Sequence, residues 1–212
     1  HKERLYSNKS IYKVGNTISD VIKNNLPLIK NNKILLTHNL KIKKFFLITL
    51  HRPESVDDPK KLKKLILNFE KLGRKFKTKF IFPVHPRTNK ILRKLNLNKT
   101  KFVVFIKPLE FLDFLFLMKN SKIVFTDSGG IQEETSLIGV PCITLRTTTE
   151  RQISLKEKTN ILTGYTYSKI NKAIAYFFLK KIKPSKAFGD GNVAKRIVKL
   201  INQIDKNSTK IN

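Results

Sequence analysis

The sequence has few cysteines, few methionines and no long apolar runs, and each shortage narrows the class of protein. It holds one cysteine, Cys142, so no intrachain disulfide can form, and such a chain fits a reducing compartment. It shows no signal-peptide pattern and no apolar run of membrane-spanning length, so we expect a cytoplasmic protein without a membrane partner. The chain begins with His1 and its only methionine is Met118, from which we expect a truncated fragment, a split subunit or a processed product of a longer protein.

Acidic residues are also scarce. The chain has 15 Asp and Glu against 44 Lys and Arg, a formal net charge of +29 and a pI near 10.3. A charge of this size is common in proteins that bind nucleic acid. The lysines, however, are scattered over most predicted helices and loops, and no helix-turn-helix, zinc-ligand or RNP-like pattern is present. We therefore expect solvated basic faces and no specific nucleic-acid partner, and a charge-driven polyanion-binding module remains an alternative.

Segments typical of strands and of helices alternate along the chain. Predicted strands cover residues 11–14, 45–50, 80–82, 102–106, 123–125, the residues after Pro141, and 160–163. Predicted helices cover residues 17–25, 59–76, 88–96, 111–118, 131–138, 168–179 and 192–204, and residues 27–44 are expected to form a loose connection. This alternation predicts an α/β fold with a Rossmann-like parallel sheet and helices on both faces.

Two of these helices carry an apolar stripe. The first begins with Asp58 as N-cap and Pro59 at the first helical position, and its apolar residues recur at helical spacing: Leu62, Leu65, Ile66, Phe69, Leu72 and Phe76. The stripe of the last helix consists of Val193, Ile197, Leu200, Ile201 and Ile204. We expect this second stripe to face something other than the domain's own sheet in the complete protein.

The segment from Ile123 to Arg151 contains the strongest functional signal. A short buried strand is followed by Asp127, Ser128, Gly129 and Gly130, then by a helix closed by Gly139 and a second strand. In such a unit the turn leaves free backbone N–H groups at the start of the helix, and the glycines keep bulky side chains away. The segment therefore predicts an anion site, most naturally for phosphate.

Charged residues near this turn favour a nucleotide over free phosphate. Glu134 stands four residues after Gly130 on the same helical face and leans back toward the helix N-terminus. A carboxylate there can accept both hydroxyls of a ribose. Arg146 and Arg151, after the second strand, add positive charge at the same edge.

Polar residues follow several predicted strands directly. They are His51, His85, Asp127 with Ser128, and Arg146. In an open parallel sheet, ligands bind at the carboxyl ends of the strands, so together these residues describe a pocket for a nucleoside diphosphate. Each residue also has a purely structural explanation. His85 could serve only to shape a turn, and Asp127 could serve only to cap the following helix.

Several motifs stand in the order and spacing of a known family. They are TLHRPE at 49–54, PVHP at 83–86, TDSGGIQEE at 126–134, GVP at 139–141, RTTTER at 146–151, GDG at 189–191 and VGNT at 14–17. With them the chain resembles the UDP-N-acetylglucosamine 2-epimerases. The likeness covers nearly the whole chain, but it matches only the second half of those enzymes.

The resemblance implies a two-domain fold of the glycosyltransferase-B type and a homodimer when complete. Residues 1–212 would be the carboxyl-terminal, UDP-binding domain, with 1–44 as the remnant of an interdomain crossover and first strand and helix, and 188–206 as the C-terminal helix. The catalytic amino-terminal domain would be absent from this chain. Three positions depart from the family pattern: Leu109 stands where some members have Gln, Gln152 where some have Pro, and Lys158 where Gly is usual.

The resemblance also implies roles for individual residues. Ser128, Gly129 and Gly130 would contact the diphosphate, Glu134 the ribose, Phe114 the uridine side, Arg151 the ligand again, and His51 would be the catalytic residue of this half. Further ligand contacts are expected among Arg52, Glu54, His85, Asp127 and Arg146.

The reaction implied is an isomerisation that interconverts UDP-N-acetylglucosamine (UDP-GlcNAc) and UDP-N-acetylmannosamine (UDP-ManNAc). UDP would be eliminated to leave an unsaturated 2-acetamidoglucal and would then return with C2 inverted. The carboxylates that move the C2 proton would belong to the missing domain, so we expect this chain alone to be inactive. No metal or redox cofactor is required.

Two other enzyme hypotheses stay open. The donor-binding half of a glycosyltransferase would share the nucleotide pocket but transfer the sugar to an acceptor. A hydrolysing epimerase would release free N-acetylmannosamine. Salt-sensitive binding to random oligonucleotides that UDP cannot displace would instead favour the polyanion-binding module.

Overall fold

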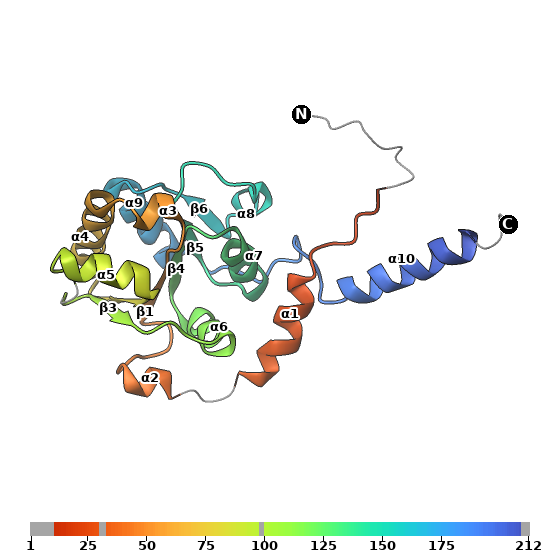
Figure 1. The fold of residues 1–212 in the computed structure, drawn as a ribbon, viewed down its shortest axis with the longest axis horizontal. Helices are drawn as coiled ribbons and strands as arrows, with labels where there is room; N and C mark the ends of the chain where they lie inside the picture. The colour runs from red at the N-terminus through yellow and green to blue at the C-terminus, as the bar shows by residue number, and fades with distance from the viewer. Residues whose placement is uncertain (1–10, 30–32, 98–99, 209–212) are drawn as a thin grey trace.

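Six parallel strands form the centre of the molecule in the computed structural model, which describes residues 11–29, 33–97 and 100–208 (Figure 1). In chain order they are β1 (Phe45–Thr49), β2 (Lys79–Pro83), β3 (Val103–Ile106), β4 (Ile123–Thr126), β5 (Cys142–Thr144) and β6 (Asn160–Leu162). Their order across the sheet is β3-β2-β1-β4-β5-β6, and each neighbouring pair is parallel. The chain runs outward from β1 to β3 and then returns to place β4 beside β1. The predicted Rossmann-like parallel sheet is confirmed, and its switch point lies between β1 and β4.

Helices cover both faces of this sheet. The described helices are α1 (Ile18–Asn25), η2 (Leu26–Leu28), α2 (Ile34–Thr37), α3 (Pro53–Val56), α4 (Pro59–Phe76), α5 (Pro86–Lys94), α6 (Phe111–Asn120), α7 (Gly129–Ile138), α8 (Gln152–Lys156), α9 (Tyr167–Leu179) and α10 (Val193–Ser208). Side chains from α4, α5 and α9 share one core cluster with the sheet. Those from α1, α2 and α6 form a second cluster on the other face, with α7 packed against it.

β1 shows how the two cores divide the strands. Phe46 and Ile48 belong to the first cluster, whereas Phe45 and Leu47 belong to the second. Successive side chains of a strand point to opposite faces, so a strand covered on both sides needs an unbroken apolar run. The sequence FFLIT supplies that run.

The predicted amphipathic helix over α4 is confirmed. The Asp58 side chain accepts hydrogen bonds from the backbone N–H groups of Lys60 and Lys61 at 2.9 and 3.2 Å, so it caps the helix as expected. The Phe69 ring lies 4.9 Å from that of Phe80 and 5.6 Å from that of Phe125, measured between centroids. These contacts tie α4 to β2 and β4.

The structure corrects the predictions near the N-terminus. Residues 11–14 do not form a strand, because the Val14 carbonyl accepts hydrogen bonds from the Arg196 guanidinium, at 3.1 Å from Nε and 2.9 Å from Nη2, instead of pairing with a strand. Residues 27–44 are not merely a loose connection, since η2 overlaps the segment and α2 lies within it. α2 forms because Ile34 is buried in the second core. Residues 30–32 of this segment lie outside the described residues.

Other boundaries also differ from the prediction. α3 and α8 were not predicted, because four or five residues are too few to show helical periodicity. α5 begins at Pro86, with the proline at the first helical position, instead of at residue 88.

α10 leaves the rest of the domain beside α1 (Figure 1). Val193 at its start is buried, whereas Val198, Ile201 and Ile204 are 57%, 51% and 44% exposed. The expectation that its stripe faces another part of the complete protein stays a prediction. No helix within the described ranges is long and apolar enough to cross a membrane.

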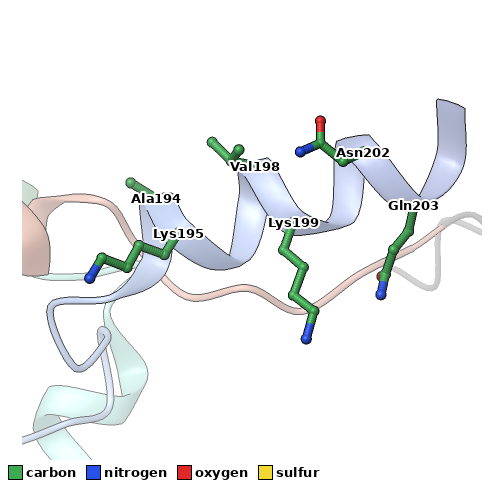
Figure 2. Close-up of a pocket in the computed structure, with 6 residues that line it drawn as sticks. All are labelled: Ala194, Lys195, Val198, Lys199, Asn202 and Gln203. Atoms are coloured by element: carbon green, nitrogen blue, oxygen red, sulfur yellow. The ribbon is translucent and has the colours of Figure 1, made fainter. Parts of the chain in front are cut away.

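A hollow of about 670 Å³ lies along α10. Figure 2 shows the six described side chains that line it, all of which come from this single helix: Ala194, Lys195, Val198, Lys199, Asn202 and Gln203. A binding site usually gathers polar groups from several elements, so this hollow is the exposed face of a helix and not a candidate site.

We predict that Phe69→Ala will lower the free energy of unfolding by about 3–5 kcal/mol, because it removes a fully buried ring at the centre of the first core. Leu67→Ala, on the same helix but 42% exposed, should cost less than about 1 kcal/mol. Urea denaturation followed by circular dichroism measures both. Equal losses would contradict the described packing of α4.

Candidate functional site

The ends of β1 and β4 meet at the switch point, where Thr49 pairs with Thr126. The carboxylate of Asp127, which follows β4, is fully buried. It accepts hydrogen bonds from the backbone N–H of His51, at 3.3 Å from each oxygen, and from that of Arg52 at 3.1 Å. It also lies 3.0 Å from His51 Nδ1. Asp127 therefore fixes the turn after β1, and it does not cap α7.

The His51 ring is held on one side and open on the other. Its side chain is 59% exposed although Nδ1 contacts the buried carboxylate. A ring that is anchored at one nitrogen and exposed at the sheet edge is suited to contact a ligand. The prediction that His51 is no core histidine is consistent with this position.

The N-terminus of α7 has the open geometry that the predicted anion site requires. Ser128 is the N-cap residue in an extended conformation, and no side chain of the described chain caps this helix end. A Cβ atom at Gly130 would have only Glu134 Oε1 and Ser128 Oγ nearby, both at 3.9 Å. The first N–H groups of α7 thus face an open space next to glycine, and the helix dipole favours an anion there.

Arg151 lies over this helix end. Its Cζ would be 3.3 Å from a Cβ atom at Gly129, so a larger residue at this position would press on the guanidinium and shift it slightly. Its Nε donates to Glu133 Oε1 at 2.7 Å, while the side chain remains 34% exposed. The guanidinium is anchored through Nε and has further N–H groups for an anion.

Glu134 lies beside the same helix end, as its spacing from Gly130 predicted. Burial, with a smaller contribution from the neighbouring Glu133 carboxylate, raises the pKa of Glu134 to about 7. No hydrogen bond or ion pair joins its carboxyl group to another described side chain.

A buried polar network fixes the loop that carries Arg151. Gln132 Nε2 donates to the Ser128 carbonyl at 3.1 Å, and Gln132 Oε1 accepts from Thr149 Oγ1 at 2.7 Å and from Asn160 Nδ2 at 3.1 Å. The Arg151 N–H in turn donates to Thr149 Oγ1 at 3.1 Å. The network joins α7 to the loop after β5.

One departure from the family pattern is accommodated locally. Lys158 replaces the usual glycine and has a φ of 56°, in the left-handed region that glycine adopts readily. A lysine adopts this backbone conformation at a cost of about 1 kcal/mol.

A second group of charged residues lines a cavity of about 260 Å³ at the same sheet edge. The lining residues are Arg52, Glu54, Lys61, Arg146, Thr147, Thr148 and Tyr165. Arg146 is paired with Glu150 through two hydrogen bonds of 3.1 and 3.0 Å, which hold the pKa of Glu150 at about 2. The structure thus brings three of the predicted residues, Arg52, Glu54 and Arg146, together.

Two predicted residues lie apart from these groups. His85 caps α5, because its Nδ1 accepts from the Arg87 N–H at 3.3 Å, which supports its role in shaping a turn. Phe114 lies on α6 and packs against the second core. Ligand contacts by either residue remain predictions.

Sequence reasoning missed Glu133, Gln132 and Asn16. Asn16 Nδ2 donates to Glu133 Oε2 at 2.7 Å, across 117 positions of sequence. A signal for Glu133 was available, since it follows Gly129 by four residues as Glu134 follows Gly130. No local pattern could have identified Asn16 as its partner.

Known proteins resemble this chain over most of its length. A family model described as UDP-N-acetylglucosamine 2-epimerase matches residues 2–202. The UDP-N-acetylglucosamine 2-epimerase of Methanococcus maripaludis is 39% identical over 202 residues, which are 92% of this chain and 55% of that protein.

Solved structures give the same result. One is the Methanocaldococcus jannaschii UDP-GlcNAc 2-epimerase in complex with UDP-GlcNAc and UDP, which matches this chain with a TM-score of 0.83 and 37% sequence identity. The match covers 93% of this chain and 56% of the M. jannaschii chain. The Neisseria meningitidis UDP-GlcNAc 2-epimerase bound to UDP-GlcNAc matches with a TM-score of 0.79 and 29% sequence identity. That match covers 93% of this chain and 57% of the N. meningitidis chain. These likenesses confirm the expected glycosyltransferase-B-type domain, and the chain spans about half the length of the relatives it matches.

We predict that wild-type protein loses stability relative to Glu134→Gln as pH rises from 4.5 to about 7. The folded state raises the Glu134 pKa from 4.5 to about 7, so it binds this proton more tightly than the unfolded state. The stability gained from the protonated form is therefore complete below pH 4.5 and is lost as pH rises through about 7. The difference should reach at most about 3 kcal/mol. Urea denaturation of both proteins between pH 4 and 8 tests this, and parallel curves would contradict it.

Proposed function

Because this chain belongs to the UDP-N-acetylglucosamine 2-epimerase family, we propose that it is the carboxyl-terminal, UDP-holding half of an enzyme that interconverts UDP-GlcNAc and UDP-ManNAc. The observation that carries the proposal is the uncapped N-terminus of α7, with Gly129 and Gly130 at its start and Arg151 over it. The relatives whose structures contain UDP-GlcNAc or UDP support the choice of ligand.

In this proposal the diphosphate lies at Ser128, Gly129 and Gly130. Backbone N–H groups and the Arg151 guanidinium meet its negative charge. Glu134, one turn into α7, accepts hydrogen bonds from the ribose hydroxyls, and Phe114 lies on the uridine side. Arg52, Glu54 and Arg146 would line the same edge beyond His51.

The proposed reaction divides its work between two domains. A base removes the C2 proton while the C1–O bond breaks and its electron pair leaves with UDP, which gives the 2-acetamidoglucal. UDP then adds back to C1 as a proton is delivered to the other face of C2. This half would stabilise the departing UDP through fixed N–H dipoles, Arg151 and His51. The carboxylates that exchange the C2 proton would come from an amino-terminal domain.

Three further parts of the proposal follow from the family and the chemistry. The complete protein would be a homodimer. A cytoplasmic location fits the single cysteine, whose burial raises the Cys142 pKa to about 12 and leaves the thiol unreactive. Elimination and re-addition of UDP move protons, and neither step passes electrons to a carrier. The proposed reaction therefore needs no redox cofactor.

We predict that residues 1–212 bind UDP weakly and that Gly130→Leu lowers the affinity at least about tenfold. The leucine side chain would occupy the space over the helix end, where the nearest atoms to a Cβ are 3.9 Å away, so the fold should not change. Ser168→Leu is the matched control, because Ser168 is exposed and occupies the same position at the start of α9. Calorimetric titration with UDP measures all three proteins.

The same samples test the absence of turnover. Incubation with UDP-GlcNAc, followed by NMR, should show neither UDP-ManNAc nor free N-acetylmannosamine from the chain alone. Epimerisation by residues 1–212 would refute the division of work between domains. UDP binding that is unchanged in Gly130→Leu would refute the site.

We predict that His51→Ala, in a protein with its amino-terminal domain, lowers turnover about a hundredfold or more. Stability should change little, because the His51 side chain is 59% exposed. His38→Ala, in the C-cap of α2, is the control. Rates come from an NMR assay of epimerisation and stabilities from thermal unfolding. Parallel losses of rate and stability would assign His51 a structural role.

A further inference from the structure

Glu133 is a buried carboxylate with two partners on opposite sides. The residue is 7% exposed, and its two oxygens each accept a hydrogen bond of 2.7 Å, one from Arg151 Nε and the other from Asn16 Nδ2. A buried carboxylate is stable only when its oxygens are bonded in this way. Glu133 therefore connects the exposed guanidinium of the anion site to a segment more than a hundred residues earlier.

Asn16 is bonded through all of its polar groups. Besides the bond to Glu133, its Oδ1 accepts from the Ile18 N–H at 3.0 Å. Its backbone N–H donates to the Phe188 carbonyl at 2.9 Å, and its own carbonyl accepts from Ser19 Oγ at 2.9 Å. Both the side chain and the backbone of Asn16 are therefore held, each by two of these bonds.

The same bonds continue to the base of α10. Ser19 Oγ accepts from the Gly191 N–H at 3.2 Å. The Asp20 carboxylate then caps α10, because it accepts from the N–H groups of Val193 at 3.0 Å and Ala194 at 3.2 Å. Hydrogen bonds thus lead from Arg151, through Glu133, Asn16 and Ser19, to Gly191, two residues before α10, and the neighbour of Ser19, Asp20, caps that helix.

We propose that Glu133 is a positioning residue, which holds the Arg151 guanidinium over the N-terminus of α7 and, through Asn16, couples it to the base of α10. An anion that orders Arg151 then stabilises the base of α10, and by linkage a fixed α10 favours the anion. The identity of that anion, the diphosphate of UDP, rests on the proposed function.

The charge of Glu133 makes its role testable. A carboxylate next to a diphosphate site repels the ligand, so charge alone predicts that Glu133→Gln binds UDP more tightly. Positioning predicts the opposite sign, because an unanchored Arg151 samples orientations that do not face the helix end. Asn16→Ala removes no charge and separates the two effects further.

A first experiment needs no ligand. In wild-type protein the Nε–H of Arg151 should exchange with solvent at least tenfold more slowly than that of Arg87, whose ion pair lies at an exposed site. Asn16→Ala and Glu133→Gln should each speed exchange at least fivefold, whereas the controls Asn25→Ala and Glu157→Gln should not. Asn25 lies on α1, and within the described residues its side chain bonds only the Val21 carbonyl. Glu157 is exposed at the end of α8. Fast exchange in the wild type, or no effect of either variant, would overturn the proposal.

A second experiment adds UDP. Glu133→Gln and Asn16→Ala should each weaken UDP binding at least fivefold, with both controls within twofold of wild type. UDP should also slow amide exchange at Val193 and Ala194 at least threefold in the wild type and in the controls, but not in Asn16→Ala. Tighter binding by Glu133→Gln, or no effect of UDP at these amides in the wild type, would overturn the proposal. If the wild type binds no UDP, the proposed ligand is wrong. The experiment without ligand then tests the positioning role of Glu133 by itself.

Discussion

The site depends on a single buried carboxylate between two neighbouring strands. Asp127 follows β4, and its oxygens bond the N–H groups of the turn after β1, so the two turns cannot move apart. One consequence is that His51 is fixed at Nδ1 while the rest of its ring is exposed. Another is that Ser128, the next residue, starts α7 in a direction set by the sheet. Parallel strands bring these ends together, and the carboxylate holds them there.

Several of the few acidic residues of this basic chain form such internal bonds. Asp58 and Asp20 cap helices, Asp127 holds a turn, and Glu70 accepts from three backbone N–H groups at the start of β3. A carboxylate that replaces the water around several N–H groups stabilises the fold more than an exposed ion pair does. The high net charge therefore reflects numerous solvated lysines and not a lack of ordered electrostatics. Glu134 differs from these residues, because no described side chain bonds its carboxyl group and burial raises its pKa to about 7.

The local parts of this molecule could be predicted from sequence, and the parts that depend on distant contacts could not. The glycine turn, the presence of a helix directly after it and the stripe of α4 follow from residue types at fixed spacing, and the structure confirms them, although α7 begins at Gly129 and not at residue 131. Residues 11–14 have the composition of a strand, but the Val14 carbonyl is bonded by Arg196, 182 positions later. Glu133, which bonds Arg151, is likewise bonded by Asn16, and no pattern within the glycine-turn segment reveals this partner. Spacing in the sequence predicts which residues would contact a ligand, whereas the residues that hold them in place could be identified only from the structure.

In the proposed enzyme this domain would form one half of the substrate site. Its polar groups are already held in place, but they are surrounded by water and not by a covering domain. Asp127, Glu133 and Gln132 fix His51, Arg151 and the start of α7 through buried hydrogen bonds, so little rearrangement is needed when an anion arrives. The side chains predicted to contact the ligand remain open to water, since His51 is 59% exposed and Arg151 is 34% exposed. Each contact between charge and dipole is weaker by several-fold in water than in a closed site. In the proposed enzyme, a covering domain would thus contribute to catalysis in two ways, by supplying the carboxylates and by excluding the water that weakens the contacts of this half.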